Sequence, residues 1–166
     1  MKNLQFDFLA DKENNTLTIR REFAANRQLV WDCYTKEELL VQWFAPKPYT
    51  VESKGLQFTN GGTWHYAMVS PEGEKHWGWA EYYNIHPIDS YESKDAFCDE
   101  NGRLQSDLPQ STWQVTFTDK GENTLVEVII TYPSLEDLET VIKMGMKEGM
   151  TMTLDYLDTM LEELTK

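Results

Sequence analysis

The chain is organised around residues 61–80, which read GGTWHYAMVSPEGEKHWGWA. Two alternating segments flank a Pro/Gly turn, and this pattern is typical of a β-hairpin. Side chains alternate across a strand, so Trp64, Tyr66 and Met68 share one face of the first arm. That face is large and apolar, and its only polar groups are an indole N–H and a hydroxyl. It therefore needs a cover, which is either a packed core or a pocket that holds a ligand.

The segments before this hairpin predict strands and two short helices. Residues 4–10 and 16–23 alternate on either side of a polar turn, which indicates an N-terminal hairpin. Asn26 is a suitable N-cap for a helix that continues to Thr35. Thr35 with Glu38 resembles a capping box for a second helix, which two nearby prolines end.

The segments after it predict further strands and a helical C-terminus. Short turns join the strands, so the sheet should be antiparallel. Ser134 marks a helix start and Gly145 a break, after which apolar residues recur every three or four positions from Met146 to Leu161. One strand is expected before the hairpin, at residues 49–57, and the second arm of the hairpin should run from 74 to about 85. The strands after it are expected at residues 90–97, 111–118 and 124–132.

These elements predict an α+β fold in one domain that spans residues 1–166. A curved antiparallel sheet of about six to seven strands should wrap around the long C-terminal helix, with two short helices after the first strand. The aromatic face of the central hairpin then meets the methionine-rich stripe of that helix.

Composition excludes several function classes. The 166 residues carry 15 basic and 28 acidic side chains, a net charge of −13. This charge opposes non-specific binding to nucleic acid or to an anionic membrane. No apolar run approaches the length of a membrane-spanning helix, and no signal peptide is apparent. Two widely spaced cysteines, Cys33 and Cys98, suggest reduced thiols in a cytoplasmic protein.

Several short motifs together carry a family resemblance. They are REFAA at 21–25, VW at 30–31, LLVQWFAP at 39–46, GGTW at 61–64, PEG at 71–73, HWG at 76–78, GMT at 149–151 and LDYL at 154–157. The ordered set resembles the activator of heat-shock-protein ATPase homologue-like family, which belongs to the START-like, or SRPBCC, superfamily. The resemblance implies a helix-grip fold around a cavity, and superfamily members bind lipids, hormones or polyketides, while a few are enzymes. The eukaryotic namesake stimulates the ATPase of a heat-shock chaperone.

A ligand cavity is expected between the central hairpin and the C-terminal helix. Many large apolar side chains gather there, as in small-molecule pockets. No set of residues suggests a catalytic site, a metal site or a bound cofactor. His65 should lie outside the cavity, whereas His76 has an orientation that the sequence leaves open. The expected lining residues are Trp43, Trp64, Tyr66, Met68, His76, Trp79, Tyr82, Trp113, Val115, Met146, Met150 and Leu154.

Three functions remain open on the sequence. The first is a non-enzymatic module that binds a small apolar or amphipathic molecule. The second is a protein-interaction domain that regulates a chaperone ATPase, which the resemblance and the acidity favour. The third is a polyketide cyclase-like enzyme that uses His76 or a tyrosine of the cavity as acid or base. A homodimer is expected only from the general frequency of two-fold symmetric proteins.

Overall fold

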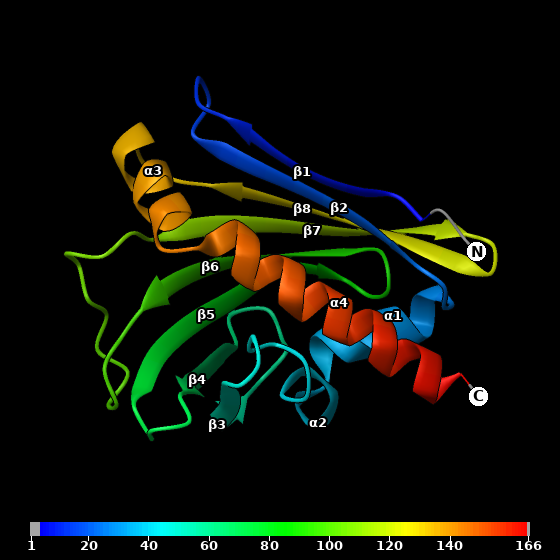
Figure 1. Cartoon of the computed structure of the whole chain (residues 1–166), viewed down its shortest axis with the longest axis horizontal. Coiled ribbons are helices and arrows are strands. Elements are labelled where there is room, and N and C mark those ends of the chain that lie inside the picture. Colours follow the sequence, from blue (N-terminus) through cyan, green and yellow to red (C-terminus); the bar gives the residue numbers. More distant parts are fainter. Residues whose placement is uncertain (1–3, 166) are drawn as a thin grey trace.

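The computed structural model describes residues 4–165, which form one curved sheet and four helices (Figure 1). All strand pairs are antiparallel, and the spatial order is β1-β2-β8-β7-β6-β5-β4-β3. The strands are β1 (Phe6–Asp11), β2 (Thr16–Phe23), β3 (Thr50–Leu56), β4 (Thr63–Val69), β5 (Lys75–His86), β6 (Ser90–Phe97), β7 (Ser111–Lys120) and β8 (Asn123–Thr131). The helices are α1 (Arg27–Thr35), α2 (Glu37–Leu40), α3 (Leu135–Lys143) and α4 (Met146–Leu164).

This architecture confirms the expected α+β fold with a long C-terminal helix against a curved antiparallel sheet. The sheet has eight strands, because both arms of the N-terminal hairpin and β3 all pair within it. The two short helices follow β2 and not the first strand, since β1 and β2 form a hairpin before the chain leaves the sheet.

The two short helices begin in different ways. Asn26 caps α1 as predicted, because its side-chain oxygen accepts a hydrogen bond from the backbone N–H of Leu29 at 2.9 Å. The predicted capping box at Thr35 is wrong. The Thr35 hydroxyl donates to the carbonyl of Trp31 at 2.8 Å, so it is used inside α1, and Lys36 begins α2 without a side-chain cap.

The C-terminal helices are divided by a glycine, as predicted. Ser134 caps α3 by accepting a hydrogen bond from the backbone N–H of Asp137 at 3.1 Å. Gly145 adopts φ +91°, a left-handed conformation that costs little only for glycine. This residue ends the first helical segment and lets α4 start in a new direction across the sheet (Figure 1).

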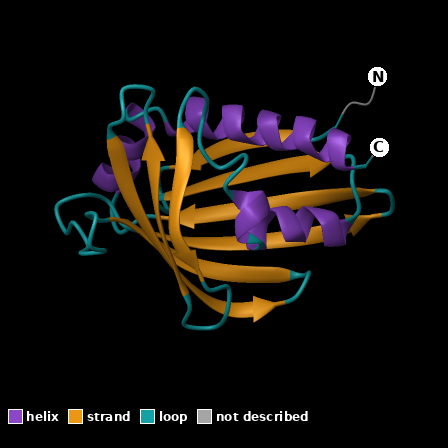
Figure 2. Cartoon of the chain, turned by 90° about the horizontal axis from the view of Figure 1, so that it is seen from below, coloured by secondary structure: helices purple, strands orange, loops and turns teal. Residues whose placement is uncertain are grey.

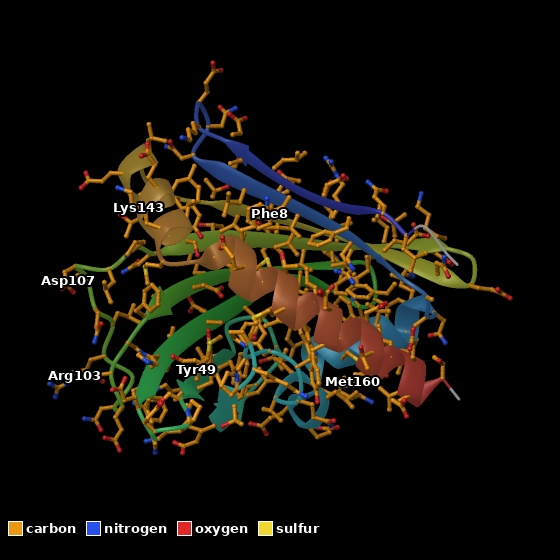
Figure 3. The ribbon with its side chains drawn as sticks, viewed as in Figure 1. Phe8, Tyr49, Arg103, Asp107, Lys143 and Met160 are labelled. Atoms are coloured by element: carbon orange, nitrogen blue, oxygen red, sulfur yellow. The ribbon has the colours of Figure 1, made fainter. Side chains whose placement is uncertain are left out.

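Helix α4 and the shorter helices lie on the side towards which the strands curve (Figure 2). Leu154, Leu157 and Leu161 of α4 are buried, as are Leu17 and Ile19 of β2. Burial of each such side chain stabilises the fold by about 1.5 to 3 kcal/mol. Side chains occupy much of the space between α4 and the sheet, whereas Arg103 and Asp107 lie on the β6–β7 loop away from the helix (Figure 3).

A second part of the core is aromatic. Trp31 of α1 makes edge-to-face contacts with Phe58, Tyr91 and Phe117, at centroid distances of 5.1 to 5.9 Å. Such geometry adds to the area that large rings bury. None of the helices within residues 4–165 combines the length and the apolar character that crossing a membrane requires.

Candidate functional site

A cavity of about 380 Å³ lies between α4 and the sheet. Strands β4, β5, β6 and β7 supply one wall, α4 supplies the facing wall, and the segment after α2 closes one side. Its lining is mostly aromatic and aliphatic, with methionines at the helix. This is the volume that the sequence places between the central hairpin and the C-terminal helix.

All but one of the residues predicted to line a ligand cavity border this space. Strand alternation accounts for this arrangement, because it fixes which side chains face inward. Trp64 is almost fully buried beneath the cavity wall, stacked on Tyr66 with ring centroids 4.0 Å apart. The lining residues that were predicted are Trp43, Trp64, Tyr66, Met68, His76, Tyr82, Trp113, Val115, Met146, Met150 and Leu154.

Trp79 is the exception, and its predicted place in this cavity is wrong. Ala80 and Tyr82 of β5 face inward, so the alternating residue Trp79 faces the other side of the sheet. There its ring lies 5.6 Å from that of His65, which hydrogen-bonds through Nε2 to the carbonyl oxygen of Asp99 at 3.1 Å. His65 therefore lies outside the cavity, as predicted.

The register of four strands sets one row of inward-facing residues. Trp64 is opposite Ala80, Ala80 is opposite Asp95, and Asp95 is opposite Ser111. Residues directly opposite in antiparallel strands point to the same face of the sheet. The small side chain of Ala80 leaves room above the sheet at this row, so Asp95 is open to the cavity.

Asp95 is the main site residue that the sequence analysis missed. Burial raises the pKa of its carboxyl from 3.8 to about 7, although a hydrogen bond from the Ser93 hydroxyl at 2.6 Å acts in the opposite direction. The signal was present in β6, where Tyr91, Ser93, Asp95 and Phe97 alternate and share the inward face. An acidic residue at such a position should draw attention, because unpaired carboxylates are costly next to apolar surface.

Four tyrosines surround the same part of the cavity, namely Tyr66, Tyr82, Tyr91 and Tyr132. Burial raises the pKa of each phenol, and the charge of Asp95 raises it further, so all four remain neutral donors near pH 7. Within residues 4–165, none of these hydroxyls has a hydrogen-bond partner from the protein, and none is fully enclosed. They are therefore available to a molecule inside the cavity.

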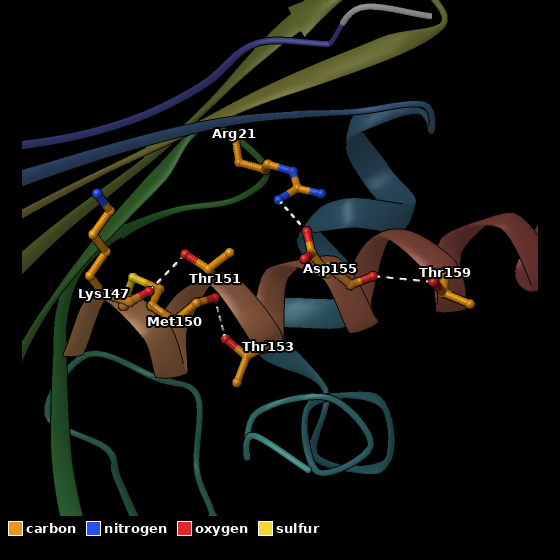
Figure 4. Close-up of polar contacts among 7 residues, drawn as sticks. All are labelled: Arg21, Lys147, Met150, Thr151, Thr153, Asp155 and Thr159. Atoms are coloured by element: carbon orange, nitrogen blue, oxygen red, sulfur yellow. Dashed lines mark hydrogen bonds and ion pairs between the residues drawn. The ribbon is translucent and has the colours of Figure 1, made fainter. Parts of the chain in front are cut away.

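The other basic side chains of the lining are already engaged or lie at the rim. Arg21 of β2 pairs with Asp155 of α4 at 2.8 Å (Figure 4). Its guanidinium also lies over the ring of Phe6 at 4.7 Å. The His76 side chain is 58% exposed, which places it at the mouth of the cavity.

The remaining reactive groups do not form a second site. Cys33 and Cys98 are buried free thiols, and burial raises the pKa of each to about 11, which disfavours the nucleophilic thiolate. In the described part of the chain, no three His, Cys, Asp or Glu side chains are grouped so that they would hold a metal ion. The arrangement is thus an apolar cavity with one carboxylate and several phenols.

Comparisons with known proteins agree with this geometry. Residues 24–162 match the model of the family described as Activator of Hsp90 ATPase homolog 1-like protein. Protein Ms6760 from Mycobacterium smegmatis is 32% identical, with a TM-score of 0.87 over 95% of this chain and 96% of that one. A protein from Arthrobacter aurescens is 29% identical, with a TM-score of 0.89 over 95% of this chain and 91% of that one.

More distant structures share the fold alone. The AHSA1 protein SPO3351 from Silicibacter pomeroyi is 21% identical, with a TM-score of 0.69 over 89% of this chain and 97% of that one. The comparison with curated proteins gave no match. The family model covers most of the chain, and the helix, sheet and cavity are those of a helix-grip domain. The chain therefore belongs to the family of Activator of Hsp90 ATPase homolog 1-like proteins.

Proposed function

We propose that this domain binds a small, largely apolar molecule in the cavity between α4 and strands β4 to β7. The observation that carries the proposal is the cavity of about 380 Å³ walled by aromatic side chains and methionines. Ligand sites in proteins typically occupy roughly 300 to 1,000 Å³ and combine an apolar wall with a few polar groups. Methionine suits such a wall, because its side chain adapts to ligands of different shape.

The opening of the cavity bears on what it would hold. The His76 side chain at its mouth is 58% exposed, so the space is open to solvent. Apolar wall left in contact with water is unfavourable, by roughly 25 cal/mol per Å². A predominantly apolar wall therefore favours a ligand with an apolar body over water.

A cavity-filling variant tests the proposal. Gly149 of α4 borders the cavity, and a Cβ added there would meet only Pro46, at 3.9 Å. Gly149→Phe should therefore place a ring in the cavity without a clash of the backbone. Met152→Phe is the matched control, since Met152 is 52% exposed and lies elsewhere on the same helix.

The assay is a screen of lipids, flavonoids and aromatic acids and amines by tryptophan fluorescence and thermal shift. A compound that binds the native chain should bind Gly149→Phe at least about tenfold more weakly, a difference of about 1.4 kcal/mol, while Met152→Phe keeps the native affinity. Absence of any response in the native chain, or equal binding by Gly149→Phe, would refute a ligand site in this cavity.

Regulation of a chaperone ATPase is the alternative proposal. The name of the family supports it, together with the net charge of −13, which suits a basic surface on a partner. It predicts that the purified domain raises the ATPase rate of the chaperone from the same host. A rate that stays flat at excess domain would remove this alternative and leave ligand binding untouched.

A further inference from the structure

Asp95 is the single carboxylate among the residues that line the cavity. The lining also contains the guanidinium of Arg21, but this group pairs with Asp155 instead. No lysine, arginine or histidine within residues 4–165 lies within ion-pair distance of Asp95. Its one hydrogen bond comes from the neutral hydroxyl of Ser93. The carboxylate therefore has remaining capacity to accept hydrogen bonds from a bound molecule.

The groups that face Asp95 are neutral on every neighbouring element. Tyr66 lies on β4, Tyr82 on β5, Tyr91 beside it on β6, and Tyr132 just beyond β8. The facing part of α4 contributes Met146, Gly149, Met150, Thr153 and Leu154, none of which titrates. No ion pair within the described part of the chain compensates the carboxylate, so its favourable partner has to come from inside the cavity.

The aromatic rings of the cavity indicate which charge the bound partner carries. Tyr66, Tyr82, Tyr91 and Tyr132 border the same cavity as Asp95. Faces of tryptophan and tyrosine attract ammonium groups, and aromatic cages recognise such cations. An anionic ligand would meet a carboxylate in the cavity and a net charge of −13 on the protein.

We propose that the molecule bound in this cavity carries one ammonium group on an apolar body, and that the ammonium pairs with Asp95 among the tyrosine rings. This inference rests on the proposed ligand-binding function and names the class of ligand. The apolar body would lie along the methionines of α4, with the charged end at β6. Fatty acids and other apolar carboxylates would bind poorly for the same electrostatic reason.

Three probes with one apolar body and different polar groups test the inference. They are 2-naphthylmethylamine, 2-naphthylmethanol and 2-naphthoate, titrated into the native chain with calorimetric detection at about pH 8. We expect the amine to bind at least about tenfold more tightly than the carboxylate, with the alcohol between them, because hydrogen bonds to charged groups are the stronger ones.

Asp95→Asn keeps the shape of the side chain and its acceptor for Ser93 but removes the charge. It should lower the affinity for the amine by about tenfold, a difference of about 1.4 kcal/mol, and change the affinity for the alcohol by less than about threefold. Glu92→Gln is the control, since it makes the same charge change on β6 at a residue outside the cavity. Thermal unfolding of both variants verifies that they fold.

The outcomes separate the two proposals. Binding of the probes in the expected order, lost in Asp95→Asn and kept in Glu92→Gln, supports the ammonium site. Binding without preference for the amine, or an amine affinity that Asp95→Asn leaves unchanged, overturns the ammonium site and leaves the ligand cavity standing. If none of the probes binds at millimolar concentration and the wider screen is also silent, both proposals fail.

Discussion

Replacement of Asp95 by asparagine should stabilise the protein, and by more at high pH than at low pH. The carboxyl has an ordinary pKa of 3.8 that burial raises to about 7. Each pKa unit corresponds to about 1.4 kcal/mol, so ionised Asp95 lowers the free energy of unfolding by up to about 4 kcal/mol. Water in the cavity reduces this cost, and we expect about 2 to 4 kcal/mol.

The sign follows from proton linkage. Between pH 3.8 and about 7 the folded state holds a proton on Asp95 that the unfolded state has lost, so stability falls as the pH rises. Below this window Asp95 has no unfavourable effect, and above it the effect is complete. An asparagine lacks this dependence, so the advantage of Asp95→Asn should grow by about 2 kcal/mol from about pH 5.5 to about pH 8.5.

Urea unfolding followed by tryptophan fluorescence measures this difference at the two pH values. Other groups also titrate in this range, but they affect both chains equally and cancel in the comparison. Glu92→Gln removes one carboxylate from the same strand outside the cavity and serves as the control for a change in net charge. A constant difference at both pH values, or a variant that is less stable than the native chain at about pH 8.5, would refute the assignment of Asp95 as an unpaired buried carboxylate.

Three further changes test the fold and the cavity wall by chemical denaturation. Gly149→Ala should raise the free energy of unfolding by up to about 1 kcal/mol, because alanine favours a helix and the added Cβ has no contact closer than 3.9 Å; a loss of stability would contradict the open space at this position. Ser134→Ala should cost about 1 kcal/mol through loss of the cap on Asp137, and Ser134→Asp should restore most of it. Trp64→Ala should cost about 3 to 5 kcal/mol, since the side chain is 1% exposed and its indole N–H donates to Ser53 at 2.9 Å; a cost under about 1 kcal/mol would contradict its place in the wall.

Periodicity predicted most of the fold, because each strand and helix has one buried side. The alternation around Trp64, Tyr66 and Met68 placed these residues on the cavity wall, and the three-and-four spacing after Gly145 predicted α4. The Thr35 cap failed for a local reason, since its hydroxyl donates to the carbonyl of Trp31 within its own helix. Neither spacing nor propensity distinguishes a hydroxyl that accepts from the next helix from one that donates back into its own helix.

For Trp79 and Asp95 the structure differs from the predicted lining for other reasons. Trp79 was assigned to the cavity by its size, whereas strand alternation, applied strictly from Tyr82, places it on the other face. Asp95 is not among the predicted lining residues, and charged residues usually face water. Its environment depends on the pairing of β6 with β5 and β7, which brings together residues 15 to 16 positions apart along the chain.

The sequence by itself determined the class of fold, the inner face of the central hairpin and the helix that covers it. These properties follow from local periodicity, since a buried face repeats every two residues in a strand and about every 3.6 in a helix. Only the tertiary structure decided that a cavity of about 380 Å³ remains between them and that Asp95 borders it without a cationic partner among residues 4–165. Volume and the absence of a partner arise from the pairing and curvature of several strands, and no local pattern in the chain encodes either one.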